Sequence, residues 1–178
     1  AIADAIVAAV AEAPATKGDL TLLDLKTYQA KERPPLCFNY RTRKICGMGP
    51  PSSGAMTIAQ TLKLIEPLGG VSGAFSAMSA QALHIIGEAQ KLAYADRNRY
   101  LADPDFISIP SGLLDAGYIE ERRKLIDLRR AMPKPAAGIP PGLAKRTFGN
   151  DQTFERAGTS HISIVDGDGN AVAMTTTI

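Results

Sequence analysis

The chain has 178 residues, of which 45% are hydrophobic and 21% are charged, and its formal net charge is +2. This composition is ordinary for one globular domain with a core of its own. The small net charge gives no argument for binding to nucleic acid or to an anionic membrane, and no apolar run is long enough to span a bilayer.

The N-terminal region is predicted to form two helices. Residues 1–13 are rich in alanine and contain only two charged residues, so this helix is expected to be buried on most sides and to end at Pro14. A short helix is predicted over residues 22–30, because Thr21 and Asp24 have the spacing of a capping box.

A hairpin is predicted next, with strands over residues 36–40 and 44–48. In this pairing Cys37 and Cys46, the only cysteines of the chain, face each other across the two strands. One interpretation is a cross-strand disulfide, and the other is two buried free thiols, because cysteine is a common core residue. Two cysteines are too few for a thiolate zinc site.

A loop over residues 49–54 leads into a helix predicted over residues 55–66. Ser52 or Ser53 is a candidate N-cap for this helix. A serine-rich loop at a helix N-terminus can also hold an anion, so both interpretations are open at this point.

A longer helix is predicted over residues 76–100. His84 lies one position off its apolar stripe and is interpreted as a packing or surface residue. Asp103 and Asp105 follow in a turn and are interpreted as loop hydrogen-bonding groups, because no histidine or third carboxylate is spaced to complete a metal site. The stripe, at helical spacing, consists of Ala82, Ile85, Ile86, Ala89, Leu92 and Ala93.

The last third of the chain contains a charged helix, a linker and a second hairpin. Residues 118–130 are predicted as an exposed helix because of their charge run. Residues 132–157, rich in proline and glycine, are predicted as a linker. The hairpin follows, with strands over residues 161–165 and 171–178 and a tight turn at Asp166–Asn170.

Hydroxyl groups give this second hairpin a chemical character. Thr159 stands just before its first strand, and Thr175 and Thr177 stand near the end of its second strand. Strand pairing places Thr177 within hydrogen-bonding reach of Thr159. If the Gly158–Thr159 bond were cut, the free amine of Thr159 could act as the base for its own hydroxyl.

The chain as a whole resembles the γ-glutamyltranspeptidase family. The resemblance covers essentially all 178 residues. It implies an N-terminal-nucleophile hydrolase with a four-layer αββα fold of the α+β class. The segments that carry it are Ala1–Val7, Gly18–Leu25 with Tyr28, Pro50–Gly54, Ala93–Arg97, Asp103–Phe106 and the hairpin from Thr159 to Thr177.

In such a family a precursor cuts itself into a large and a small subunit. The new N-terminal Thr then attacks γ-glutamyl amides such as glutathione, and the γ-glutamyl group passes through an ester to water or to an acceptor amino acid or peptide. By motif, Thr159 is the nucleophile, Gly158–Thr159 is the processing bond, Thr177 is the hydrogen-bonding partner and Thr175 supports it. The resemblance implies no cofactor and no metal.

The same resemblance divides the chain as a single partial domain. Residues 1–158 correspond to the C-terminal part of the large-subunit region, and residues 159–178 to the first hairpin of the small-subunit region. The chain starts at Ala1 inside a helix pattern and ends inside a strand pattern, so we expect a piece of a longer protein. The rest of the small subunit is then its partner, and the parent is expected to be periplasmic or secreted, with a cytoplasmic location left open.

The chain departs from the family motifs at two positions, and it lacks several groups that the family uses. Ser160 replaces the second Thr of the family's Thr-Thr-His start, and Ala55 replaces a glycine after the serine pair. The groups that would hold the substrate and form the oxyanion hole lie outside these 178 residues. The fragment itself is therefore expected to be inactive, with Gly158–Thr159 intact, and either to self-associate or to have poorly ordered terminal strands. The alternatives are a cephalosporin or glutaryl acylase and a non-catalytic structural fragment.

Overall fold

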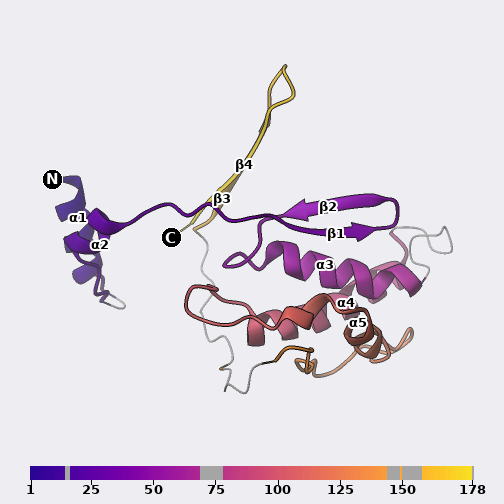
Figure 1. Cartoon of the computed structure of the whole chain (residues 1–178). Helices are drawn as coiled ribbons and strands as arrows, with labels where there is room; N and C mark the ends of the chain where they lie inside the picture. Colours follow the sequence, from indigo (N-terminus) through magenta and orange to yellow (C-terminus); the bar gives the residue numbers. More distant parts are fainter. Residues whose placement is uncertain (15–16, 69–77, 144–148, 150–157, 178) are drawn as a thin grey trace.

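The computed structural model describes residues 1–14, 17–68, 78–143, 149 and 158–177. Within them the chain is α+β, with helices and two separate antiparallel hairpins (Figure 1). None of the helices described is both long enough and apolar enough to cross a membrane. The helices are α1 (Ile2–Ala11), α2 (Leu22–Thr27), α3 (Gly54–Ile65), α4 (Ala80–Tyr100) and α5 (Ala116–Arg123), with 3-10 turns at Glu66–Leu68 and Ser111–Leu114. The strands are β1 (Leu36–Tyr40), β2 (Arg43–Gly47), β3 (Ser160–Val165) and β4 (Ala171–Thr176).

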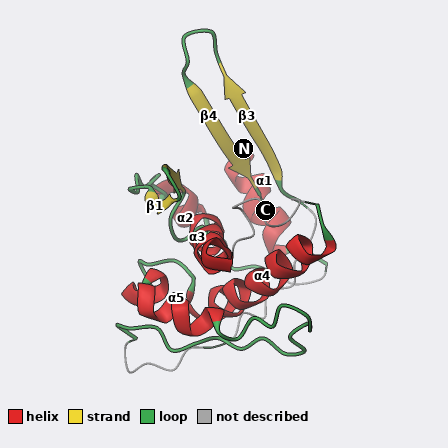
Figure 2. Ribbon diagram, turned by 90° about the vertical axis from the view of Figure 1, so that its right-hand side faces the viewer, coloured by secondary structure: helices red, strands yellow, loops and turns green. Residues whose placement is uncertain are grey.

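Helices α3, α4 and α5 pack together as the body of the molecule, and the β1–β2 hairpin covers α3 on the side away from α4 (Figures 1 and 2). The predicted stripe of α4 is the face turned to this body, where only Ile86 of the six residues is partly rather than fully buried. Ser79 caps α4 by accepting a hydrogen bond from the N–H of Ala82 at 3.2 Å. The main core cluster contains Leu64, Ile65, Ile85, Ala89, Leu92, Ile119 and Ile126.

Helix α1 has no buried residue, and only Ala3, Val7 and Val10 are half-buried, which contradicts the prediction that it is buried on most sides. It packs against α2, and both stand apart from the body at the end of an extended segment (Figure 1). An apolar composition predicts that a helix has a surface to bury but does not identify the element that covers it, and among the described residues α2 covers α1 only in part. Helix α2 keeps its predicted capping box, in which Thr21 accepts from the N–H of Asp24 at 3.2 Å, and it ends at Thr27.

The two cysteines form a disulfide between β1 and β2, which decides between the two interpretations. Cys37 and Cys46 are directly paired, with their Cα atoms 4.1 Å apart, and both are exposed, not buried. Their neighbour Phe38 is buried beside α3. Because successive side chains of a strand point to opposite faces, burial of Phe38 turns Cys37 toward solvent.

The predicted exposed helix over residues 118–130 is shorter and more buried than its charges suggest. Helix α5 ends at Arg123, and the Asp127 carboxylate then accepts hydrogen bonds from the N–H groups of Arg129 and Arg130 in a turn. Arg122 has a side chain only 7% exposed and forms an ion pair at 3.1 Å with Asp96 of α4, which is 2% exposed. A charge run in sequence does not identify the one member that has a buried partner.

Asp96 is the centre of a buried polar cluster. Its Oδ2 accepts hydrogen bonds from the Tyr118 hydroxyl at 2.6 Å and from Gln60 Nε2 at 3.0 Å. Burial, and then the hydrogen bond to Asp96, raises the pKa of Tyr118 well above its ordinary value. The cluster joins α3, α4 and α5, so it holds the body together with polar contacts in the middle of an apolar core.

The same cluster fixes the first part of the predicted linker. The N–H of Gly138 donates to Asp96 Oδ1 at 2.9 Å, the Tyr100 hydroxyl donates to the Gly138 carbonyl at 2.5 Å, and Arg122 donates to the Ala136 carbonyl at 2.7 Å. A Cβ atom at position 138 would collide with Tyr118 and Arg122, so the close approach requires glycine. Residues 132–143 have no helix or strand, as predicted, yet they are held against the body. The rest of the predicted linker, except residue 149, lies outside the described residues.

Candidate active site

The β3–β4 hairpin projects away from the helical body (Figures 1 and 2). Its turn forms where the sequence predicts it, at Asp166–Asn170, with Gly169 at a φ of +84° that favours glycine. The Asp166 carboxylate accepts from the backbone N–H of Asn170 at 2.8 Å and of Asp168 at 3.0 Å. A further hydrogen bond from the Asn170 side chain, together with these backbone N–H groups, lowers the pKa of Asp166. The ionised carboxylate therefore organises the turn.

At the open end of the hairpin, two predicted site residues meet. Thr159 Oγ1 lies 2.7 Å from Thr177 Oγ1, and either hydroxyl can be the donor. The last paired residues of the two strands are Ser160 and Thr176, so Thr159 and Thr177 each lie one residue outside the paired region. Both are exposed, and so is Gly158, which precedes them. A nucleophile here has a hydroxyl neighbour and an accessible peptide bond beside it.

A histidine that sequence reasoning did not select lies next to this pair. His161 Nδ1 is 2.8 Å from Thr175 Oγ1 on β4, and its Nε2 is 3.0 Å from Ser163 Oγ on β3. The signal that could have found it is strand alternation, since residues two apart share a face. We call the surface formed by Thr159, His161, Ser163, Thr175 and Thr177 the polar face of the hairpin.

The opposite face of the hairpin is apolar. Ile162 and Met174 pair across the strands, as do Ile164 and Val172, and these four side chains are 44–58% exposed. No residue of β3 or β4 is buried. The hairpin therefore has a polar face that carries the candidate reactive groups and an apolar face whose burial is energetically favourable.

The serine loop is tied into the body and shows no feature of a catalytic site. Ser52 Oγ accepts from the N–H of Gly54 at 3.3 Å, and Ser53 Oγ accepts from Arg97 Nε at 3.3 Å. Ser53 is the N-cap residue of α3 by position, although its side chain does not cap the helix. These bonds favour the structural interpretation of the loop.

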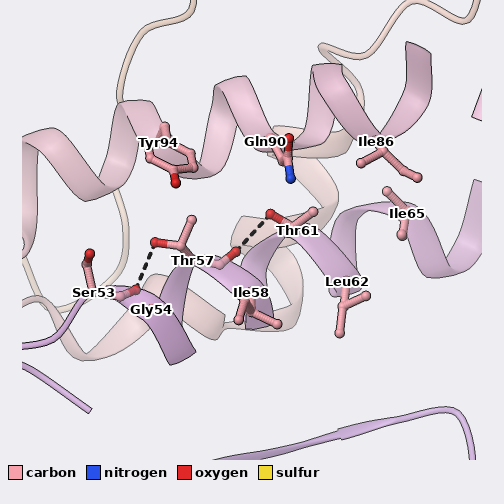
Figure 3. A pocket seen from close by; sticks show the side chains of 10 residues that line it. All are labelled: Ser53, Gly54, Thr57, Ile58, Thr61, Leu62, Ile65, Ile86, Gln90 and Tyr94. Atoms are coloured by element: carbon pink, nitrogen blue, oxygen red, sulfur yellow. Dashed lines mark hydrogen bonds between the residues drawn. The ribbon is translucent and has the colours of Figure 1, made fainter. Parts of the chain in front are cut away.

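A cavity of about 410 Å³ lies between α3 and α4, as Figure 3 shows. The hydroxyls of Thr57 and Thr61 in it donate back to carbonyls of their own helix, each at 2.8 Å. Among the described residues no charged side chain lines the cavity, so they offer no partner there for the charged groups of an amino-acid substrate. It is lined by Ser53, Gly54, Thr57, Ile58, Thr61, Leu62, Ile65, Ile86, Gln90 and Tyr94.

The carboxylates interpreted as loop groups form ion pairs. Asp103 and Asp105 both contact Arg33, and Asp105 also contacts Lys31. The hydrogen bond from Lys31, followed by that from Arg33, lowers the pKa of Asp105. His84, interpreted as a packing or surface residue, has Nε2 at 2.8 Å from the Asp127 carbonyl. Within the described part of the chain, no three His, Cys, Asp or Glu side chains are grouped to hold a metal ion.

Comparison with known proteins gives this geometry its context. The family model for gamma-glutamyltranspeptidase matches residues 1–178. Glutathione hydrolase proenzyme of Escherichia coli strain K12 is 40% identical over 162 residues, which cover 90% of this chain and 26% of that protein. Acylase ACY 1 proenzyme of Pseudomonas sp. strain V22 is 37% identical over 165 residues, which cover 92% of this chain and 27% of that protein.

A solved structure agrees with these sequence matches. Gamma-glutamyltranspeptidase from Pseudomonas nitroreducens, complexed with L-DON, superimposes with a TM-score of 0.66 at 28% identity. The match covers 77% of this chain and 41% of that one. The chain thus spans about a quarter of the length of the curated relatives it matches, and the relatives include both hydrolases and acylases.

Proposed function

Because this chain belongs to the γ-glutamyltranspeptidase family, we propose that the whole protein hydrolyses or transfers γ-glutamyl amides such as glutathione, with Thr159 as its nucleophile. The observation that supports this assignment best is the 2.7 Å contact between the Thr159 and Thr177 hydroxyls, directly after the accessible Gly158–Thr159 bond. An isolated threonine hydroxyl is a weak nucleophile, and a neighbouring hydroxyl and a free amine are the groups that can activate it.

The proposed maturation step is cleavage of Gly158–Thr159. The Thr159 hydroxyl attacks the Gly158 carbonyl carbon, the C–N bond breaks, and the hydroxyl proton ends on the released amine. Water then hydrolyses the resulting ester, which leaves a Gly158 carboxylate and a free N-terminal Thr159. On this proposal residues 1–158 belong to the large-subunit region, with residues 132–157 as the linker, and residues 159–178 begin the small subunit.

In the proposed reaction the free amine of Thr159 takes the proton of its own hydroxyl. The oxygen attacks the γ-glutamyl carbonyl, an ester forms, and the departing amine takes the proton. Water or the amine of an acceptor amino acid or peptide then attacks the ester and releases the nucleophile. Thr177 holds the hydroxyl in place, and Thr175 supports it from the same strand.

The setting of this chemistry is also part of the proposal. The two hairpins and the helical body are pieces of a four-layer αββα fold that the rest of the small subunit completes. The exposed disulfide between Cys37 and Cys46 supports a periplasmic or secreted location, because disulfides persist in oxidising compartments. The 178 residues alone are expected to be inactive, because the substrate also needs groups that hold and polarise it.

The test uses the full-length parent and a chromogenic γ-glutamyl anilide. Thr159→Ala should stop cleavage at Gly158–Thr159 and lower hydrolysis by at least about 10³-fold, while Thr159→Ser should retain part of both. Ser160→Ala is the matched control, because its side chain points to the opposite face of the strand. Mass spectrometry reports the cleavage, and activity that survives in Thr159→Ala would refute the nucleophile assignment.

An acylase is the second candidate, favoured by the similarity to the Pseudomonas acylase. A glutaryl anilide differs from the γ-glutamyl anilide only by lacking the α-amino group, so comparing the two substrates separates the candidates. Preference for the γ-glutamyl compound supports the first function, and preference for the glutaryl compound supports the acylase. A non-catalytic fragment would be indicated if neither substrate reacts.

A further inference from the structure

The histidine on the polar face of the hairpin is bonded at both ring nitrogens, once across the strands and once along its own strand. A neutral imidazole has one N–H, so one nitrogen donates and the other accepts, while a hydroxyl can serve either nitrogen because it both donates and accepts. Thr175 and Ser163 therefore satisfy His161 in either tautomer, and the ring is fixed between two strand positions.

The position of this ring matters because the candidate nucleophile lies at an open hairpin end. Thr159 and Thr177 lie just outside the ladder, whose last main-chain pair is Ser160 with Thr176. An isolated two-stranded hairpin is marginally stable, and its open end is where the strands separate first. The bond between His161 and Thr175 is the next cross-strand side-chain contact on the same face.

We propose that His161 is a positioning residue for the nucleophile. It ties β3 to β4 two residue pairs inside the Thr159–Thr177 contact and so holds the two threonine hydroxyls at hydrogen-bonding distance. His161 acts through Thr175 and does not touch the reacting atoms. The inference rests on the proposed function of Thr159 and assigns the cross-strand contact, rather than the same-strand contact to Ser163, as the one that matters.

Two amide substitutions separate these contacts. The amide group of asparagine can occupy the place of His161 Nδ1, so His161→Asn keeps a partner for Thr175. The longer glutamine side chain places its amide near Nε2, so His161→Gln keeps a partner for Ser163. Both variants are uncharged, polar and similar in size to histidine, which makes each the control for the other.

The experiment uses the full-length parent, with the rate of cleavage at Gly158–Thr159 and the kcat and KM for a γ-glutamyl anilide as readouts. Activity is expressed per N-terminal Thr159, counted by mass spectrometry, so that a loss of folded protein does not count as a loss of rate. We expect His161→Asn to stay within about threefold of the parent in kcat. We expect His161→Gln to lose about 10- to 100-fold in kcat with KM nearly unchanged, because small displacements of a nucleophile are costly.

His84→Ala is the matched control, since His84 is the other histidine of the chain and contacts a backbone carbonyl of the body. The proposal is overturned if His161→Gln equals or exceeds His161→Asn in both readouts, and this includes the case in which neither variant cleaves. Thr159→Ala separates this failure from failure of the proposed function. If Thr159→Ala is inactive and both His161 variants behave like the parent, only the role of His161 is wrong.

Discussion

At the residue scale, the buried pair of Asp96 and Arg122 is the centre of the polar cluster that joins α3, α4 and α5. Asp96 receives hydrogen bonds from α3, from α5 and from the backbone at Gly138. Together with the Arg122 guanidinium, these donors give both side-chain oxygens of Asp96 a partner. Removing it leaves Arg122 buried without its counter-charge, which is more costly than removing both partners.

We predict that Asp96→Ala lowers the free energy of unfolding of the chain by about 3–5 kcal/mol. The double variant Asp96→Ala with Arg122→Met should be less destabilised than Asp96→Ala alone, because no uncompensated charge remains. Urea denaturation followed by circular dichroism measures both. Glu121→Ala is the control. It removes an exposed charge from α5, the helix of Arg122, and should leave the urea midpoint unchanged. A double variant less stable than the single one would contradict the prediction.

At the element scale, the disulfide of the β1–β2 hairpin closes a loop between residues nine positions apart. Closing such a loop removes conformational entropy from the unfolded chain. The hairpin also has a second attachment, because Phe38 is buried beside α3. Reduction should therefore destabilise the chain without detaching the hairpin.

We predict that reducing the Cys37–Cys46 disulfide lowers the free energy of unfolding by about 2–3 kcal/mol, the value expected for a short closed loop. The variant Cys37→Ser with Cys46→Ser should match the reduced protein and be insensitive to dithiothreitol, which makes it the control. Urea midpoints with and without reductant measure the effect. Equal midpoints for the oxidised and reduced protein would be the opposing result.

The sequence predicts those elements whose signals are local. The capping box of Thr21 and Asp24, the turn at Asp166–Asn170 and the stripe of α4 all depend on residues a few positions apart, and the structure contains them. The burial of Arg122 could not be predicted in this way, because its partners come from α4 and from the loop at Ala136. His161 lies opposite Thr175 in the same hairpin pairing that predicts the Thr159–Thr177 contact, so strand alternation is the signal that could have found it.

At the scale of the whole molecule, the exposed apolar face of the β3–β4 hairpin is a surface for association. Ile162, Ile164, Val172 and Met174 form two cross-strand pairs on this face. Exposed apolar patches and open strand edges both promote contact between copies of a chain. The sequence leaves two expectations, self-association or poorly ordered terminal strands. Because β3 and β4 are paired in the structure, we predict self-association.

We predict that the 178-residue chain self-associates through this face. Ile162→Lys should shift the light-scattering mass toward the monomer, because the charge cannot be buried against another copy. Ser163→Lys places the same charge one residue along the strand on the polar face and should leave association unchanged. If the parent chain is already a monomer at every concentration tested, the prediction is wrong.

Residues 132–143 are anchored to the body, whereas the β3–β4 hairpin is not part of the core. Substitutions in these two regions therefore affect different properties of the protein. Within the described residues, the loop contacts the body at Ala136 and Gly138, and β3 and β4 contribute no buried residue to the core. Substitutions in the body and on the polar face therefore have different neighbours, and their effects on free energy should add. Evolution can adjust the stability of the body and the chemistry of the hairpin in separate steps, without compensating each change in one by a change in the other.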